Sequence, residues 1–231
     1  SPPLREMQRR RLRAGRFRWH GEMASALAAS RGRATLIANE LVDAFPATQW
    51  MWSGGRWHEI GVRLTASGPE EILLEPDPAR IRRWCPDGFP DLDRPAEGAR
   101  IEMHPAFAEW FASWLPGLLS GAVLIIDYGG EKLRPRPGGS LRAFWHHQAL
   151  RGTDVFLRPG RQDITADVDM DQVRRWGEAH GLRTASHTSL ATFLDRWDTL
   201  RTRDPVAAAL ADPDGAGDAF RVLDQRREAA P

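Results

Sequence analysis

Several residue types are scarce in this chain of 231 residues. The single cysteine, Cys85, excludes an internal disulfide and leaves a thiolate zinc site without a second cysteine ligand. Such low cysteine usage is typical of a reducing compartment, and we expect the protein to be cytoplasmic. Apolar runs are also short: the run at 121–126 covers six residues, whereas a membrane-spanning helix needs about 20. The sequence therefore predicts no membrane span.

Lysine is almost absent, since Lys132 is the only lysine among 32 basic residues. The formal net charge is +1, but residues 1–35 hold nine arginines against two glutamates. The rest of the chain, with 23 basic and 29 acidic residues, therefore carries a net charge of −6. A basic segment of this kind is more often a solvated face than a nucleic-acid site. We do not expect a nucleic-acid partner.

Familiar catalytic motifs are missing as well. No G-x-G-x-x-G follows a predicted strand, and the chain has no Walker loop, no H-E-x-x-H and no G-x-S-x-G. The seven histidines are scattered apart from His146 and His147, whose rings would point in different directions on a regular element. We therefore expect no metal site.

The pattern of apolar residues predicts an α/β fold formed by a single domain over 1–231. The Ala-Thr-Leu-Ile-Ala pattern at 34–38 and the continuous apolar run at 122–126 are typical of buried parallel strands. We expect a mostly parallel sheet covered on both faces by helices. The further elements that we expect are helices over 3–14 and 105–118 and helices beginning after Asp169, Ser189 and Asp204, and strands at 17–20, 182–187 and 219–224.

Two segments interrupt this pattern. Residues 47–75 alternate with a period of two around Ser53-Gly54-Gly55, which predicts a β-meander insertion. Residues 131–168 form a long polar connection rich in proline and glycine, and a connection of that length is usually functional or disordered.

Both buried strands end in polar residues: the first in Asn39, Glu40 and Asp43, the second in Asp127 and Tyr128. In open α/β sheets the ligand crevice lies at the carboxyl ends of the strands. A carboxylate pair there can hold a guanidinium or take a proton from an attacking nitrogen. From spacing alone an alternative stays open, in which Asn39 and Asp43 cap the next turn and Glu40 is solvated.

The stretch 38–46, Ala-Asn-Glu-Leu-Val-Asp-Ala-Phe-Pro, resembles the N-E-x-x-D-A-x-P signature of the MidA family, whose members include mitochondrial complex I assembly methyltransferases. Further matches to this family follow in the same order along the chain: Ser1-Pro2 with Leu4 and Gln8, Trp19-His20, the 54–59 hairpin with Val62, Ile126-Asp-Tyr-Gly129, Gly139-Ser-Leu-Arg-Ala143 with His147, the 159–165 segment with Val168-Asp169, and Phe220-Arg-Val-Leu223.

The resemblance implies a class I methyltransferase fold with a Rossmann-like sheet. The strand ending at Asn39 would be its fourth and the strand ending at Asp127 its fifth. In this family the Gly-rich loop and the ribose-binding carboxylate lie upstream of the first matched motif, so the resemblance implies an N-terminally truncated sheet. We therefore expect these residues alone to bind the implied cofactor, S-adenosyl-L-methionine, poorly and to be inactive by themselves.

The resemblance also implies roles at the site. Asn39 would face the cofactor, and the catalytic residues Glu40 and Asp43 would orient a target guanidinium. The residues that we expect to bind substrate are Asp127, Tyr128, His147, Gln162 and Asp163. For Gln162, Asp163 and Asp167 the alternative that they pin the long connection against the sheet stays open.

We therefore expect an S-adenosylmethionine-dependent methyltransferase of protein arginine. Its partner would be a protein substrate, with a respiratory-complex subunit as the example that the resemblance suggests. The alternative is a non-catalytic assembly or binding protein derived from the same fold.

Overall fold

The computed structural model of the chain describes residues 2–12, 15–75, 77, 79, 95–130, 134–196 and 205–229. Its main sheet has the strand order β1-β6-β13-β12, and β11 pairs with β6 beyond the end of β1. The bounds of these strands are β1 Arg33–Asn39, β6 Ser120–Gly130, β11 Val168–Asp169, β12 Arg183–Ser189 and β13 Phe220–Arg227.

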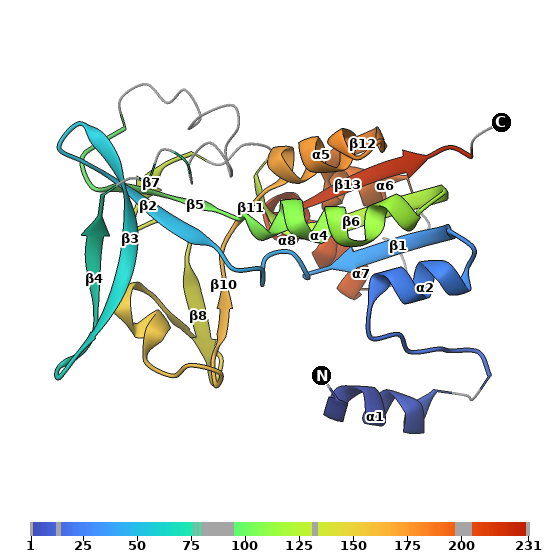
Figure 1. Cartoon of the computed structure of the whole chain (residues 1–231), viewed down its shortest axis with the longest axis horizontal. Helices are drawn as coiled ribbons and strands as arrows, with labels where there is room; N and C mark the ends of the chain where they lie inside the picture. The colour runs from blue at the N-terminus through green and yellow to red at the C-terminus, as the bar shows by residue number, and fades with distance from the viewer. Residues whose placement is uncertain are drawn as a thin grey trace.

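Two smaller sheets accompany the main one. The first has the order β4-β3-β2-β5-β7 and lies to the left of the main sheet in Figure 1. Its strands are β2 Thr48–Ser53, β3 Arg56–Thr65, β4 Gly68–Leu74, β5 Ala99–Met103 and β7 Arg136–Pro137. The second has the order β10-β8-β9, with the strands β8 Arg142–Trp145, β9 Gln148–Leu150 and β10 Asp163–Thr165.

Helices cover both faces of the main sheet (Figure 1). The helices are α1 Pro2–Arg11, α2 Met23–Ala29, α4 Ala106–Trp114, α5 Met170–Ala179, α6 Leu190–Asp195, α7 Pro205–Leu210 and α8 Ala216–Ala219, and the short 3-10 turns are η1 Leu115–Gly117 and η2 Gly152–Phe156. Sequence signals for two starts are confirmed: the side chains of Asp169 and Ser189 accept hydrogen bonds from the backbone N–H groups of Gln172 and Thr192.

The main core lies between β6 and the helices α4 and α5. Phe107, Phe111 and Trp114 form the apolar stripe of α4 and are buried against Val123 and Ile125 of β6. On the opposite face of the sheet Val222 is also fully buried. The central strand is therefore covered on both sides, which is why its sequence is a continuous apolar run.

Shortening a side chain in this core is expected to be costly. Ile125→Ala should lower the free energy of unfolding by about 2–5 kcal/mol, because Ile125 is fully buried and its removal leaves a cavity. Denaturant unfolding measures the loss. Ile37→Ala on β1 is the control, since Ile37 is 67% exposed and its truncation opens no cavity; equal losses in the two variants would contradict the position of β6.

The strand directions differ from the expected mostly parallel sheet. β1 and β6 are parallel, but β13 is antiparallel to both β6 and β12. A strand that is covered on both faces has the same apolar pattern whichever way its neighbour runs. The pattern of 122–126 therefore indicated burial correctly and could not indicate the direction of the adjacent strand.

Three other expectations need correction. The strand at 34–38 is not buried on both faces: Ala38 is buried, whereas Thr35 and Ile37 on the other face of β1 are exposed. Residues 17–20 form no strand; instead, the Trp19 indole donates to Gln8 Oε1 at 2.9 Å, and Arg9 lies 5.6 Å from the Trp19 ring centre. The segment is thus held against α1. The connection 131–168 is ordered over 134–168, where it forms β7 to β11 and η2, and residues 131–133 lie outside the described part.

The described part of the chain contains no helix with both the length and the apolar character that crossing a membrane requires.

Residues 47–75 form the antiparallel strands β2, β3 and β4, as their alternation predicts.

The lengths of β1 and β6 set the position of the polar residues. β1 ends at Asn39, which is opposite Ile126, while β6 continues to Gly130. Asp127 is therefore inside β6 and is the first residue past the end of the β1 ladder. The chain that leaves β1 turns across this point.

Candidate functional site

The turn that follows β1 begins with Glu40 in an unusual backbone conformation. Its φ is 45°, in the left-handed region that residues other than glycine rarely adopt. The Glu40 N–H donates to the carbonyl of Ile126 at 2.9 Å, and the Asn39 amide donates to Glu40 Oε1 at 3.3 Å. The strained backbone places an exposed carboxylate over the carboxyl ends of the two parallel strands.

The Asp127 carboxyl group binds the backbone of this turn. Its side chain is fully buried, and its Oδ2 accepts hydrogen bonds from the backbone N–H groups of Leu41, Val42 and Asp43 at 3.2, 3.0 and 3.2 Å. Its Oδ1 accepts from the N–H of Tyr128 at 3.0 Å. The structure thus places Asp127, which we expected to contact substrate, beneath the turn that carries Glu40 and Asp43.

The pKa of Asp127 is raised to about 7, chiefly because burial disfavours the charged carboxylate and secondly because Asp43 lies close. A carboxyl group whose pKa is higher in the folded state contributes stability that is complete below its unfolded pKa of about 4. That contribution is lost as the pH rises through about 7.

We therefore expect wild type to gain stability relative to Asp127→Asn as the pH falls from 8 to about 4. The asparagine variant has no proton to bind at this position, so the difference between the two proteins isolates Asp127. Chemical denaturation across this pH range measures it. A difference that is constant with pH would show that the Asp127 pKa is not raised.

Asp43 is also buried and is bound by the inserted segment. Its Oδ2 accepts a hydrogen bond of 2.7 Å from Thr165 Oγ1 of β10, and its carbonyl accepts from the N–H of Ala166 at 3.4 Å. Only 5% of Asp43 is exposed, whereas Glu40 lies on the surface. The two carboxylates thus differ in access: Glu40 can touch a ligand directly, and Asp43 lies behind it.

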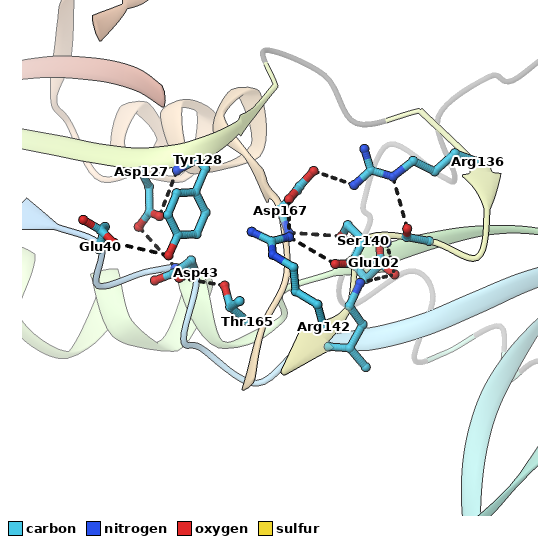
Figure 2. A network of polar contacts seen from close by, with 12 residues as sticks. Glu40, Asp43, Glu102, Asp127, Tyr128, Arg136, Ser140, Arg142, Thr165 and Asp167 are labelled. Atoms are coloured by element: carbon cyan, nitrogen blue, oxygen red, sulfur yellow. Dashed lines mark hydrogen bonds and ion pairs between the residues drawn. The ribbon is translucent and has the colours of Figure 1, made fainter. Parts of the chain in front are cut away.

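Tyr128 binds the exposed carboxylate of the pair, as Figure 2 shows. Its hydroxyl donates to Glu40 Oε2 at 3.3 Å. The pKa of Tyr128 is raised well above its ordinary value by burial first, and then by a hydrogen bond to Asp43 and by the neighbouring carboxylates. The phenol therefore stays protonated and remains a hydrogen-bond donor.

The electrostatic character of this turn is acidic. The one histidine close behind it, His104, is fully buried, and burial lowers its pKa to about 4, so it is neutral at pH 7. The negative charges of Glu40 and Asp43 are thus not neutralised by His104. Such a place favours a cationic group, and a planar guanidinium can bind carboxylate oxygens in a bidentate way.

Three residues that we expected to bind substrate do not lie at this turn. His147 is in the turn between β8 and β9, at the end of β8 that is opposite Arg142, the residue of β8 that faces Tyr128. The strand between Arg142 and Trp145 is about 10 Å long. The Gln162 amide donates to the carbonyls of Asp154 and Val155 and so ties β10 to η2. Asp163 is exposed and pairs with Phe144 in the ladder between β8 and β10.

Sequence reasoning missed two residues that the structure brings to the turn, Thr165 and Arg142. Thr165 binds Asp43, and the Arg142 guanidinium lies 5.3 Å from the centre of the Tyr128 ring. Both residues belong to segments that match the MidA pattern, so the matched segments held a signal. Thr165 and Asp43 are 122 residues apart in the sequence, so no local pattern indicates the contact between them.

The side chains at the turn fit one part of S-adenosyl-L-methionine. Its sulfonium is a cation, and the exposed amide of Asn39 presents a polar group that suits that charge at the carboxyl end of β1. Among the described residues Asn39 is the one that we assign to the cofactor, and the Glu40 carboxylate beside it is left for the acceptor. When bound, the cofactor would supply an electrophilic methyl group at the carboxyl ends of β1 and β6.

The comparison with protein families decides the assignment. A family model described as "Putative S-adenosyl-L-methionine-dependent methyltransferase" matches residues 1–188. The chain belongs to this methyltransferase family. The match confirms the prediction made from the MidA signature, and the cofactor of the family is S-adenosyl-L-methionine.

Relatives and solved structures agree with the family. The chain is 26% identical over 147 residues to the protein arginine methyltransferase NDUFAF7, mitochondrial, of Rattus norvegicus, which covers 64% of this chain and 32% of the relative. The Drosophila melanogaster homolog is 28% identical over 169 residues, covering 71% and 36%. The chain thus spans about a third of the length of the curated relatives that it matches.

A crystal structure of a Burkholderia thailandensis protein bound to S-adenosyl-homocysteine matches the whole chain with a TM-score of 0.80 and 27% identity. The match covers 63% of that protein. It confirms the α/β methyltransferase fold that the resemblance implied.

The cytoplasmic prediction is wrong, because the curated relatives are mitochondrial proteins. The prediction depended on a single cysteine, and cysteine usage reports the redox state of a compartment rather than which compartment it is.

Proposed function

We propose that the protein transfers a methyl group from S-adenosyl-L-methionine to an arginine side chain of a protein substrate. The observation that carries this proposal is the exposed Glu40 carboxylate, held over the carboxyl ends of β1 and β6 by Tyr128 and backed by the buried Asp43. The printed names of the curated relatives, protein arginine methyltransferases, support the same acceptor.

The chemistry asked of Glu40 has two parts. Its carboxylate binds the target guanidinium and fixes one nitrogen in line with the methyl group. As the new N–C bond forms, the methyl–sulfur bond breaks, S-adenosyl-homocysteine leaves, and the nitrogen loses a proton. Glu40 is exposed and can accept that proton and pass it to water, whereas Asp43 is enclosed and stabilises positive charge from behind.

Incubation of labelled S-adenosyl-L-methionine and the full-length protein with an extract of cells that lack the gene tests the proposal. After acid hydrolysis of the labelled proteins, we expect the label in methylarginine. Label in another amino acid would contradict the acceptor. Absence of label would contradict the activity itself and favour a non-catalytic assembly or binding role for the fold.

A respiratory-complex subunit as acceptor stays a prediction. Mass spectrometry of the proteins labelled in the same incubation identifies the acceptor.

A further inference from the structure

One rung of the small β8–β10 ladder supplies both contacts between the inserted segment and the site. Arg142 of β8 and Thr165 of β10 are register partners, so their side chains lie on the same face of the ladder. Thr165 donates to Asp43 at 2.7 Å, and the Arg142 guanidinium carbon lies 5.3 Å from the centre of the Tyr128 ring. The inserted segment thus touches the buried carboxylate and the phenol that binds Glu40.

Arg142 is held firmly in this place. Its Nη1 donates to Asp167 Oδ1 at 2.7 Å and to the carbonyl of Ser140 at 3.1 Å, and the side chain is only 16% exposed. Asp167 also binds Arg136 Nη2 at 2.5 Å. Burial acts to raise the pKa of Asp167, but the hydrogen bonds from both arginines hold it below its ordinary value, so the carboxylate stays charged.

A buried anchor fixes the segment that carries Arg142 (Figure 2). Ser140 Oγ donates to Glu102 Oε2 at 2.6 Å, and the Ser140 N–H donates to Glu102 Oε1 at 2.9 Å. Ser140 Oγ in turn accepts from the N–H of Asp167 at 3.0 Å. Glu102 belongs to β5. The position of Arg142 is therefore set by the β4-β3-β2-β5-β7 sheet as well as by its own strand, β8.

The Tyr128 ring has partners from two different elements. Phe220 of β13 meets it edge-on, with ring centres 4.9 Å apart, and Arg142 lies over it. Contacts between a guanidinium and an aromatic face are attractive and restrict the ring. The Tyr128 hydroxyl, which donates to Glu40, is therefore directed by a ring that cannot turn freely.

We propose that Arg142 is a positioning residue for methyl transfer, because it holds the Tyr128 ring in the orientation from which the phenol fixes the Glu40 carboxylate. This inference rests on the proposed function of Glu40. Arg142 touches neither methyl donor nor acceptor in this role. Its effect on the reaction passes through Tyr128, and that dependence distinguishes it from a substrate contact.

Kinetics of three variants test the dependence. We expect Arg142→Met to lower kcat by about 10-fold with little change in KM, because the carboxylate is misplaced rather than removed. Arg142→Lys, which keeps the charge and retains a donor for Asp167, should recover part of the loss. Arg136→Met is the matched control. Arg136 binds the same Asp167 carboxylate but is more exposed than Arg142, and we expect its replacement to change kcat by less than about twofold.

A double-mutant cycle gives the sharpest result. Tyr128→Phe removes the hydroxyl and keeps the ring, and we expect it to lower kcat by about 10-fold. In that background Arg142→Met should add less than about twofold, because its route to Glu40 is already broken. Losses that multiply to about 100-fold would overturn the inference, since Arg142 would then act without Tyr128.

A spectroscopic measurement reports on the contact itself. Tyr128 is the only tyrosine among these 231 residues, and the Tyr128→Phe spectrum identifies its ring resonances in protein labelled with 13C-tyrosine. We expect Arg142→Met to shift these resonances and Arg136→Met to leave them in place. Unchanged resonances and unchanged kcat in Arg142→Met would overturn the inference.

The two proposals fail differently. No methyl transfer by wild type would overturn the proposed function and this inference with it. A normal wild-type rate with multiplicative losses would overturn this inference alone. If Arg142→Met does not fold, Arg142→Lys takes its place in the cycle, where an added loss in the Tyr128→Phe background equal to its loss in wild type would overturn the inference.

Discussion

Replacement of Glu40 by glutamine is expected to lower the turnover of methyl transfer by about 100-fold or more. The amide keeps the shape of the side chain and its bond with Tyr128, but it removes the charge that holds a guanidinium and accepts its proton. Because the carboxylate is exposed, the free energy of unfolding should change by less than about 0.5 kcal/mol. Single-turnover methyl transfer and denaturant unfolding measure the two effects.

The matched control is Glu70→Gln, another exposed glutamate, which pairs with Arg63 on the β3–β4 hairpin away from the turn. Its turnover should equal that of wild type. Equal turnover in the Glu40 variant and in this control would remove Glu40 from the site. Asp43→Asn separates two roles of Asp43: reduced turnover supports an electrostatic role, whereas reduced stability with normal turnover indicates that Asp43 only anchors Thr165.

Truncation of Asp127 is expected to have the largest effect on stability. Asp127→Ala leaves the N–H groups of residues 41, 42, 43 and 128 without their acceptor in a buried place. We expect the free energy of unfolding at pH 8 to fall by about 3–5 kcal/mol, because each unsatisfied buried donor costs about 1–3 kcal/mol and the turn can relax in part.

Asp127→Asn keeps one acceptor oxygen in the same place and should lose less than the alanine variant. Asp163→Ala is the surface control, since Asp163 is exposed, and it should stay within about 0.5 kcal/mol of wild type. A loss of less than about 1 kcal/mol in Asp127→Ala would contradict the role of Asp127 as the anchor of the turn.

Much of the frame around this turn was predictable from the sequence, because it depends on burial. The apolar run at 122–126 marked the central strand β6, and the pattern at 34–38 marked β1, which lies at the end of the strand order and has one exposed face. The polar residues that follow the two segments marked the carboxyl ends of these strands. These patterns can be recognised from the residues of each strand alone. They do not show that β6 continues past Asp127, because that extension depends on pairing with β13 and β11.

The roles of individual carboxylates were less predictable. Glu40, Asp43 and Asp127 look alike in the sequence, yet one is exposed and two are buried. Burial of Asp127 follows from the chain turning across it, and burial of Asp43 follows from Thr165 on a distant strand. All three carboxylates are equal candidates by their spacing in the sequence. Only the structure separates Glu40, which can touch a ligand, from Asp43 and Asp127, which are buried.

The expected substrate contacts His147, Gln162 and Asp163 show the same limit. They lie in matched segments, but residues 142–165 form the small β10-β8-β9 sheet, and the far end of that sheet carries His147 away from the turn. The resemblance identified the segment. The strand pairing of Arg142 with Thr165 determines which of its residues lie at the turn.

A crystal structure of the full-length protein with S-adenosyl-homocysteine and a peptide that contains the methylated arginine tests most directly where the acceptor binds. We predict a guanidinium nitrogen within about 3.2 Å of a Glu40 carboxylate oxygen, on the side facing the sulfur atom. A target guanidinium bound at another place, with Glu40 in contact only with solvent, would contradict the central claim that this carboxylate holds the acceptor.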